Sequence, residues 1–473
     1  MHLEHHFAGL GEAFYAKTSV QPLHKQRLVE FNQTLAQSLS INIKSPDTKR
    51  ILSGEESLEN SLSMVYAGHQ FGGFSPQLGD GRGVLLGEIL DGQGILHDLH
   101  MKGAGPTPFS RRGDGRAVLR SCIREYLASE FMHALAIPTS RALALYSSSE
   151  AVYRERPEPG AMLLRTAQGH IRFGHFEFFF SQGKKEELSQ LIDYCLTYYY
   201  PDCLALESPL EGMLIQVVER TARMIAKWQT VGFQHGVMNT DNFSFTGETI
   251  DYGPYGFMED YEPNWVCNHS DHEGRYAFSR QPGIGLWNLN CLMRCFSAHL
   301  ERNQLIAILQ HYEVALQAHY NQLMAEKMGL VGYASIELLL APLLDILALE
   351  KMDYSIFFRL LCHVQPNEFD VVLDEVIDRE RMKSWLLRYQ EARFQVVTEW
   401  PLVCHGMLRV NPKFTLRNYL AHEVITSAEQ GDLLPFRRLL TVLTAPFDEH
   451  LWADSLAQRA PEWGKSLEVS CSS

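Results

Sequence analysis

The chain has 473 residues, a length sufficient for two to four domains. Of these residues 45% are hydrophobic and 21% are charged, proportions typical of a globular protein. Its net charge of −14 disfavours a nucleic-acid binder held by bulk electrostatics, so we expect no nucleic-acid partner. The sequence has no apolar run of about 18 residues and no secretory signal at its N-terminus, so it predicts a cytoplasmic protein with no membrane partner.

The first half of the chain predicts a small lobe rich in strands. Residues 1–60 carry short helical patterns and form a predicted N-terminal extension, and the predicted lobe follows at 61–205. "GVLLGEIL" and "ILHDLHMKG" are typical of a hairpin joined at "DGQG". The remaining predicted elements are a helix within 25–38, a helix over 113–138 with Asp114 as N-cap and Pro138 as its stop, and strands at 140–148, 161–167 and 171–180.

The second half predicts mainly helices. A helix over 209–236 presents one apolar stripe, formed by Leu214, Val217, Val218, Thr221, Met224, Ile225 and Trp228. Further helical patterns fill a second lobe at 206–350 and a C-terminal region at 351–473. This order predicts an α+β chain with the two-lobe fold of protein kinases and extra C-terminal helices. A nucleotide would then bind in the cleft between the lobes.

The stretch "HGVMNTDNFSFTGETIDYGPYGF" has the spacing of a kinase catalytic loop followed by its metal-binding triplet. Asn242 and Asp251 supply an amide and a carboxylate oxygen, which are ligands that Mg²⁺ prefers. Val237 stands where kinases place the catalytic Asp, and valine cannot accept a proton. Asp241 is the nearest carboxylate and is the predicted base. The alternative is a protein that binds nucleotide without chemistry.

Several cations are predicted to contact the phosphates. Lys102 ends a strand pattern, and Glu125 lies on the buried stripe of the following helix, so the two are expected to pair. Arg165 and Arg172 are expected to bind a polyphosphate from the same cleft. The turn "LGDGRG" offers backbone amides for an anion nest, with added charge from Arg82.

The longest motifs resemble one known family. "YAGHQFGGFSPQLGDGRGVLLGE", "HMKGAGPTPFSRRGDGRAVLRSCIREYL", "RFGHFEFF", "CNHSDHEGRYAF" and the kinase-like stretch of residues 235–257 are similar to the selenoprotein O family, as are "NPKFTLRNYL" and the "SCSS" terminus. The resemblance implies a pseudokinase-like fold that binds ATP in reversed orientation. It also implies transfer of AMP to Ser, Thr or Tyr hydroxyls of other proteins, with release of pyrophosphate and with Mg²⁺ or Mn²⁺ as cofactor.

The resemblance also implies a role for each matching residue. Asp241 would accept the proton, Lys102 would contact the phosphates and Glu125 would hold Lys102. Asn242 and Asp251 would bind the metal, and Asp251 would also contact the nucleotide. The remaining nucleotide-binding residues would be Gly79, Gly81, Arg82, Asp114 and Gly115 along the site and Arg165 and Arg172 on the distal phosphates.

Cysteines suggest a form of regulation. The chain has nine cysteines and no Cys-x-x-Cys pair, so most are expected to be buried reduced thiols. Cys471 lies in a terminal tail, which is expected to be mobile. A disulfide between Cys471 and an exposed thiol at Cys267 would tether this tail across the cleft. Two rival functions also remain: a small-molecule kinase of the aminoglycoside-phosphotransferase type, and a nucleotide-binding scaffold without transfer.

Overall fold

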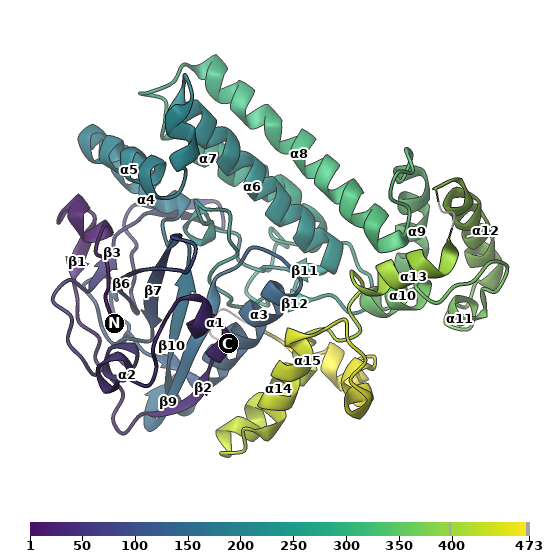
Figure 1. Cartoon of the computed structure of the whole chain (residues 1–473), viewed down its shortest axis with the longest axis horizontal. Helices are drawn as coiled ribbons and strands as arrows, with labels where there is room; N and C mark the ends of the chain where they lie inside the picture. The colour runs from purple at the N-terminus through teal and green to yellow at the C-terminus, as the bar shows by residue number, and fades with distance from the viewer. Residues whose placement is uncertain (397–398, 470–473) are drawn as a thin grey trace.

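The computed structural model describes residues 1–396 and 399–469 and shows an antiparallel sheet in the N-terminal part and helices in the C-terminal part (Figure 1). The α+β class predicted from the sequence is therefore confirmed. The main sheet runs in the order β1 (Tyr15–Lys17), β3 (Leu62–Met64), β6 (Gly83–Leu90), β7 (Leu96–Lys102), β10 (Pro157–Ala167), β9 (Arg141–Tyr153) and β2 (Arg27–Phe31), and β8 (Ala117–Val118) pairs with β10. Two short ribbons pair β4 (Gly68–Gln70) with β5 (Gly73–Ser75), and β11 (Phe233–Gln234) with β12 (Gly256–Phe257).

The two faces of the main sheet enter different cores because successive side chains on a strand point to opposite sides. On β6, Val84 and Leu86 pack in the core formed with α1 (Gln33–Ser38) and α2 (Pro46–Leu52). Leu85 points the other way and packs in the larger core that contains α3 (Leu119–Ala134). The predicted hairpin is confirmed, since β6 pairs with β7 from Gly83–Lys102 to Leu90–Leu96.

Helices form the rest of the chain. The long helices α6 (Pro209–Val231) and α8 (Arg302–Met328) lie side by side (Figure 1). The C-terminal helices α14 (Asn418–Glu429) and α15 (Leu434–Thr444) return to pack against α3. The other helices are α4 (Phe173–Ser181), α5 (Lys185–Tyr198), α7 (Gln281–Arg294), α9 (Glu337–Glu350), α10 (Tyr354–Leu361), α11 (Asp370–Leu373), α12 (Arg379–Val396), α13 (Trp400–Leu408) and α16 (Glu462–Lys465).

The predicted helix over 209–236 is confirmed as α6, and all seven residues of its apolar stripe are buried. It ends at Gly232, whose φ of 71° lies in the left-handed region that glycine adopts without steric cost. This end is important for the site, because β11 and the kinase-like stretch come directly after it.

Three expectations about local structure were wrong. The segment 25–38 is helical only from Gln33, because residues 27–31 pair with β9 at the edge of the sheet. The segment 171–180 is mostly the helix α4 rather than a strand; its aromatic residues suit a strand, but burial on nearly every side decides the outcome. The helix predicted over 113–138 is confirmed only as α3, with Val118 rather than Asp114 at its N-cap.

The first 60 residues pack closely against the rest of the N-terminal part. The strands β1 and β2 lie at the two ends of the main sheet, and α1 and α2 cover one of its faces. Within the part of the chain that the structure describes, no helix combines the length and apolar character needed to cross a membrane.

Candidate active site

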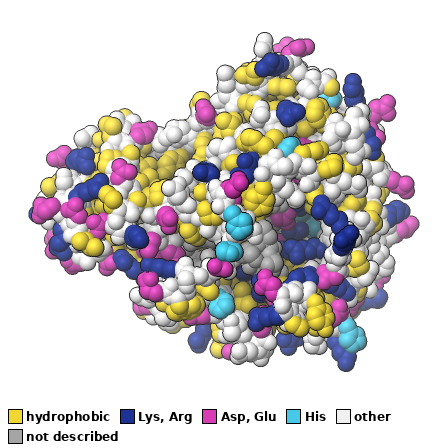
Figure 2. Space-filling view, turned by 180° about the vertical axis from the view of Figure 1, so that it is seen from behind, with side chains coloured by type: hydrophobic (Ala, Val, Ile, Leu, Met, Phe, Trp, Pro, Cys, Tyr) yellow, Lys and Arg dark blue, Asp and Glu magenta, His cyan; other side chains and the backbone are white. Residues whose placement is uncertain are grey.

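A cavity of about 860 Å³ lies between the main sheet and the loops that come after α6. Figure 2 shows a hollow on one face of the molecule with Lys and Arg side chains along its wall. Glu125 lies behind the wall of the cavity, where it is buried. Every other residue predicted for nucleotide, metal or proton transfer lines the cavity: Gly79, Gly81, Arg82, Lys102, Asp114, Gly115, Arg165, Arg172, Asp241, Asn242 and Asp251.

Lys102 and Glu125 form the predicted ion pair. Lys102 is the last residue of β7, and its ammonium donates to Glu125 Oε2 on α3. Arg165 NH1 donates to the other carboxylate oxygen at 3.1 Å. Burial alone would raise the pKa of Glu125, but the charges of Lys102 and Arg165 hold it below the usual range. The carboxylate thus fixes two cations at the wall of the cavity.

Asp251 is held by both predicted arginines. Arg165 NH1 donates to its Oδ1 at 2.7 Å, and Arg172 NH1 donates to its Oδ2. Burial alone would raise the pKa of Asp251, but the guanidiniums of Arg172 and Arg165 lower it well below its usual range. Both carboxylate oxygens are therefore engaged, so a metal ion would have to displace or share these contacts.

A histidine that was not among the predicted site residues orients Arg165. His100 Nδ1 lies 3.0 Å from Arg165 NH2, and its Nε2 lies 3.2 Å from Asp80 Oδ2. Because Arg165 can only donate, His100 must accept at Nδ1 and donate from Nε2, and it must be neutral. Burial lowers the pKa of His100, which is consistent with this neutral form. His100 is two residues before Lys102 on β7, so both side chains point to the same face of the strand. This spacing was the feature of the sequence that could have predicted His100 as a site residue.

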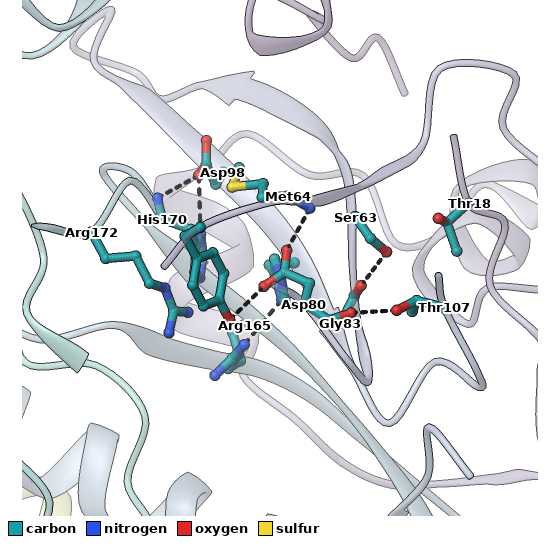
Figure 3. Close-up of polar contacts among 12 residues, drawn as sticks. Thr18, Ser63, Met64, Asp80, Gly83, Asp98, Thr107, Arg165, His170 and Arg172 are labelled. Carbon is teal, nitrogen blue, oxygen red and sulfur yellow. Dashed lines mark hydrogen bonds and ion pairs between the residues drawn. The ribbon is translucent and has the colours of Figure 1, made fainter. Parts of the chain in front are cut away.

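Asp80 anchors the glycine turn of residues 79–83 (Figure 3). It accepts from the backbone N–H of Met64 at 3.0 Å, and its own carbonyl accepts from Thr107 Oγ1 at 2.8 Å. Gly79 has a φ of 146°, and a Cβ atom there would lie 2.8 Å from the carbonyl oxygen of Met64. Glycine is therefore required for this close approach.

The turn was expected to offer free backbone N–H groups to an anion, but most of the N–H groups that would do so already have partners. The N–H groups of Asp80, Gly81 and Gly83 donate to carbonyl oxygens of Met64, Gly79 and Asp80, so they are already engaged. Asp114 is also engaged, because it forms a bidentate pair with Arg154 at 2.7 and 3.0 Å. The turn therefore offers a close backbone surface and the exposed Arg82 side chain rather than a set of free amides.

Asp241 has one carboxylate oxygen without a hydrogen-bond partner among the described residues. Its Oδ2 accepts from Gln70 Nε2 at 3.1 Å, whereas its Oδ1 is buried without a hydrogen-bond partner among the described residues. A Cβ atom at Gly68 would lie 2.4 Å from Oδ1, so only glycine leaves room for the carboxylate there. Burial raises the pKa of Asp241 to about 6. These are properties of a group that can exchange a proton near neutral pH.

The loop that carries Asp241 is tied to the segment that carries Asp251. His235 Nε2 lies 3.0 Å from the carbonyl oxygen of Ile250. Asn242 Nδ2 donates to the carbonyl oxygen of Val237 at 3.0 Å, which leaves the amide oxygen of Asn242 available for a cation. Val237 itself lines the cavity.

We predict that Glu125→Gln weakens ATP binding by about tenfold or more, which is about 1.4 kcal/mol. The substitution removes the anion that fixes Lys102 and Arg165, so both cations lose their positions. It should also lower the free energy of unfolding by about 3–5 kcal/mol, because buried charges are left unpaired. ATP titration calorimetry and chemical denaturation measure the two effects.

The matched control is Glu130→Gln. Glu130 lies on the same helix, is buried and forms a bidentate pair with Arg141 at 2.9 and 2.7 Å. It does not line the cavity, so this variant should lose stability and keep its ATP affinity. Equal ATP affinities for the two variants would contradict the assigned role of Glu125.

Comparison with known proteins identifies the family. The family described as "Protein adenylyltransferase SelO" matches residues 1–444. The chain belongs to the SelO family. The protein nucleotidyltransferase YdiU of Marinomonas sp. (strain MWYL1) is 75% identical over 473 residues, which is 100% of both chains. Proteins of the same name from Vibrio cholerae serotype O1 and Pseudoalteromonas atlantica are each 47% identical, over 484 and 480 residues respectively, and each match spans 100% of this chain and 99% or 100% of the relative. The chain is thus an enzyme of the nucleotidyltransferase class.

The geometry adds supporting residues that sequence reasoning on the SelO motifs missed. Gln70 and His100 bind the predicted residues Asp241 and Arg165, and Asp80 in turn binds His100. Tyr66 lies under Arg172, with 4.8 Å between the guanidinium carbon and the ring centroid. Gln70 and Tyr66 belong to "YAGHQF", a stretch with polar side chains that shortly precedes the glycine turn of residues 79–83. That position was the feature of the sequence that could have predicted them as site residues.

The C-terminal tail reaches the back of this site. Asn268 forms a parallel bridge with Val469, and His269 N–H donates to the carbonyl oxygen of Val469 at 2.8 Å. The tail is therefore docked up to Val469 rather than mobile there. Cys267 is buried, not exposed as predicted, and its Sγ lies 2.8 Å from the carbonyl oxygen of Pro254. Cys471 lies outside the described residues.

Proposed function

We propose that this enzyme transfers AMP from ATP to Ser, Thr or Tyr hydroxyls of other proteins and releases pyrophosphate. The observation that carries this proposal is the position of Asp241, whose Oδ1 has no partner among the described residues while the position of a kinase base is occupied by Val237. A base displaced in this way suits attack at a different phosphorus. The names of the relatives, which specify adenylyl or nucleotidyl transfer to protein, support the same reaction.

The proposed fold is that of a protein kinase. We assign residues 61–205 to the N-lobe, 206–350 to the C-lobe and 351–473 to an additional helical region. The support comes from the pairing of Lys102 on a strand with Glu125 on a helix that packs against the sheet, and from the loops that come after α6. ATP would lie in the cavity in reversed orientation, with its distal phosphates on Arg165 and Arg172.

In the proposed reaction the acceptor hydroxyl oxygen attacks the α-phosphorus, and its proton passes to Asp241. The bond between the α-phosphorus and the bridging oxygen breaks, and pyrophosphate leaves with the bonding electrons. Lys102, Arg165 and Arg172 would stabilise the negative charge that develops on this leaving group. Gln70 would orient Asp241 toward the hydroxyl by holding its other carboxylate oxygen.

The residues present fit a hard divalent cation. The Asp251 carboxylate and the amide oxygen of Asn242 are the kinds of oxygen donor that Mg²⁺ and Mn²⁺ prefer, and they would hold the ion. When bound, the ion would neutralise phosphate charge. In the nucleotide-free protein Arg165 and Arg172 bind both carboxylate oxygens of Asp251. When ATP binds, the two arginines would contact its phosphates instead, and the carboxylate oxygens could then bind the ion.

ATP labelled at the α- or γ-phosphorus tests the proposed function. The enzyme is incubated with a cell lysate and Mg²⁺ or Mn²⁺, and protein-bound label is counted after denaturing separation. Adenylyl transfer predicts protein-bound label from the α position only. Protein-bound label from γ above that of the lysate without the enzyme would indicate a kinase, and no label from either position above that background would indicate a nucleotide-binding scaffold.

We also propose that a disulfide between Cys267 and Cys471 regulates transfer. The bridge between Asn268 and Val469 supports it, because it places the tail beside Cys267 two residues before Cys471. Oxidation would fix the tail against the segment that contains Pro254, which comes after Asp251 and lines the cavity. A mild thiol oxidant would accept the two electrons and two protons released by the thiols.

Peptide mapping without reductant should therefore find Cys267 joined to Cys471 after mild oxidation, and transfer rates should differ between oxidised and reduced enzyme. Cys471→Ser should make the rate insensitive to the oxidant. A Cys471 thiol that stays reduced in the oxidised, folded enzyme would contradict the proposed disulfide. Cys404→Ser serves as a control on a buried thiol elsewhere in the chain.

A further inference from the structure

A second group of metal-ligating side chains lies outside the residues that line the cavity. It consists of His69 on β4, Glu177 on α4 and Cys291 on α7. Each residue offers one ligand atom, and the three atoms all lie within 4.8 Å of one another. The Glu177 and Cys291 side chains are buried, whereas the His69 side chain is 19% exposed. An ion could therefore reach the group from the His69 side.

The residue types indicate which ion fits. Imidazole nitrogen, carboxylate oxygen and thiolate sulfur together suit Zn²⁺, whereas Mg²⁺ and Ca²⁺ prefer oxygen ligands alone. Bonds of about 2.0–2.3 Å from a tetrahedral ion place its ligands roughly 3.3–3.8 Å apart. The ligand atoms lie within 4.8 Å of one another, so the widest separation would have to close by up to about 1.5 Å, and the 2.5 Å between His69 and Glu177 would have to open by about 0.8 Å. Three protein ligands would leave the fourth position to water.

The elements that surround the group hold its members in place. His69 Nδ1 lies 2.5 Å from Glu177 Oε1, so the imidazole and the carboxylate face each other across a hydrogen bond, and a bound ion would take the place of the shared proton. Trp287, one helical turn before Cys291 on α7, packs edge-on against the His69 ring with centroids 5.3 Å apart. Cys291 is a free, buried cysteine whose thiol faces these two polar groups. A buried thiol in that position is available to a metal.

We propose that His69, Glu177 and Cys291 form a zinc site that is distinct from the nucleotide-metal site at Asn242 and Asp251. The bound ion joins the β4–β5 ribbon to α4 and α7. Glu177 Oε2 also accepts from Thr240 Oγ1, and Thr240 precedes Asp241. Gln70, which holds Asp241, comes directly after His69 on β4. Zinc therefore fixes the two segments that orient Asp241.

Cobalt substitution tests this site directly. The metal-free enzyme is titrated with Co²⁺ in the presence of excess Mg²⁺, and the thiolate-to-cobalt charge-transfer band is followed in the near ultraviolet. The wild-type enzyme should develop the band at one equivalent of Co²⁺, and Zn²⁺ should abolish it. Cobalt bound only to histidines or carboxylates gives no such band, so the histidines near the N-terminus do not interfere.

Matched variants locate the site. Cys291→Ser should lose the band, whereas Cys295→Ser, at a buried thiol one turn further along, should keep it. His69→Ala should weaken Zn²⁺ binding by at least about tenfold, the loss already seen when outer partners of metal ligands are removed. Folded Asp251→Asn should keep the band, because Asp251 is not one of the three proposed zinc ligands. The readout does not involve transfer, so it is independent of the proposed function.

Two kinds of result would overturn the zinc site. Absence of the band in the folded wild-type enzyme would refute it, even if no variant could be purified. A band that persists in Cys291→Ser, or one that disappears equally in Cys295→Ser, would assign the thiolate ligand to another cysteine.

Discussion

Replacement of Asp241 by asparagine should lower the rate of transfer by about 10²–10⁴-fold, because the acceptor hydroxyl loses its base. Asparagine has nearly the same shape as aspartate, and its amide oxygen can still accept from Gln70. ATP affinity should therefore remain close to that of the wild type. Transfer of α-label, measured at saturating ATP, separates the two properties.

The pH dependence of wild-type transfer should report the same carboxylate. Burial raises the pKa of Asp241 to about 6, and only the ionised form can accept a proton. The rate should therefore fall as the pH is lowered through about 6. A rate that is independent of pH from well below to well above this pKa, together with an active Asp241→Asn variant, would exclude Asp241 as the base.

Stability provides a control on the same variant. Because the pKa of Asp241 is higher in the folded state, the folded protein holds the proton more tightly, and stability is lost as the pH rises from 3.8 to about 6. Above that range the buried charge costs about 1–3 kcal/mol. Asp241→Asn removes this cost, so at a pH about two units above the pKa it should unfold at a denaturant concentration at least as high as the wild type.

Replacement of Asp251 by asparagine should reduce both stability and transfer. Arg165 and Arg172 would keep their buried charges, since a guanidinium does not lose its proton. We expect the free energy of unfolding to fall by about 3–5 kcal/mol and transfer to fall by at least about 10²-fold. Asp251 has a φ of 57°, and asparagine tolerates this left-handed conformation, so backbone strain does not explain the loss.

ATP should restore part of the stability of Asp251→Asn, because its phosphates supply the negative charge that the two arginines lose. Chemical denaturation with and without ATP measures this effect. Asp260→Asn is the control: Asp260 pairs with Lys465 at the surface, so the change should be within about 1 kcal/mol. An Asp251→Asn variant with wild-type stability would show that the two arginines do not depend on this carboxylate.

Much of the site could be predicted because its residues occur in short stretches with characteristic spacing. The pairing of Lys102 with Glu125 followed from a strand pattern, a helix pattern and the cost of a buried charge, and the structure confirms it. The structure also brings Arg165, Arg172 and Asp251 together, although sequence spacing gave no indication that both arginines would bind Asp251 before any phosphate is present.

The parts that could not be predicted depend on tertiary contacts. The segment 171–180 has the composition of a strand and folds as α4, because the core around it favours a helix with almost every side chain buried. Gln70 contacts Asp241 across 171 positions of sequence, a separation that no local pattern reveals. The expected anion nest is mostly absent because the N–H groups of Gly81 and Gly83 close the turn itself and that of Asp80 donates to Met64 on the neighbouring strand.

Phosphorus NMR of a single reaction provides the most direct test of adenylyl transfer with Asp241 as the base. The enzyme, ATP, a divalent cation and a purified acceptor protein are mixed, and the released phosphorus species are counted against AMP bound to the acceptor. We expect one pyrophosphate for each bound AMP, and both products should form at least about 10²-fold more slowly with Asp241→Asn. Release of ADP with a phosphorylated acceptor, or of pyrophosphate at an undiminished rate from Asp241→Asn, would contradict it.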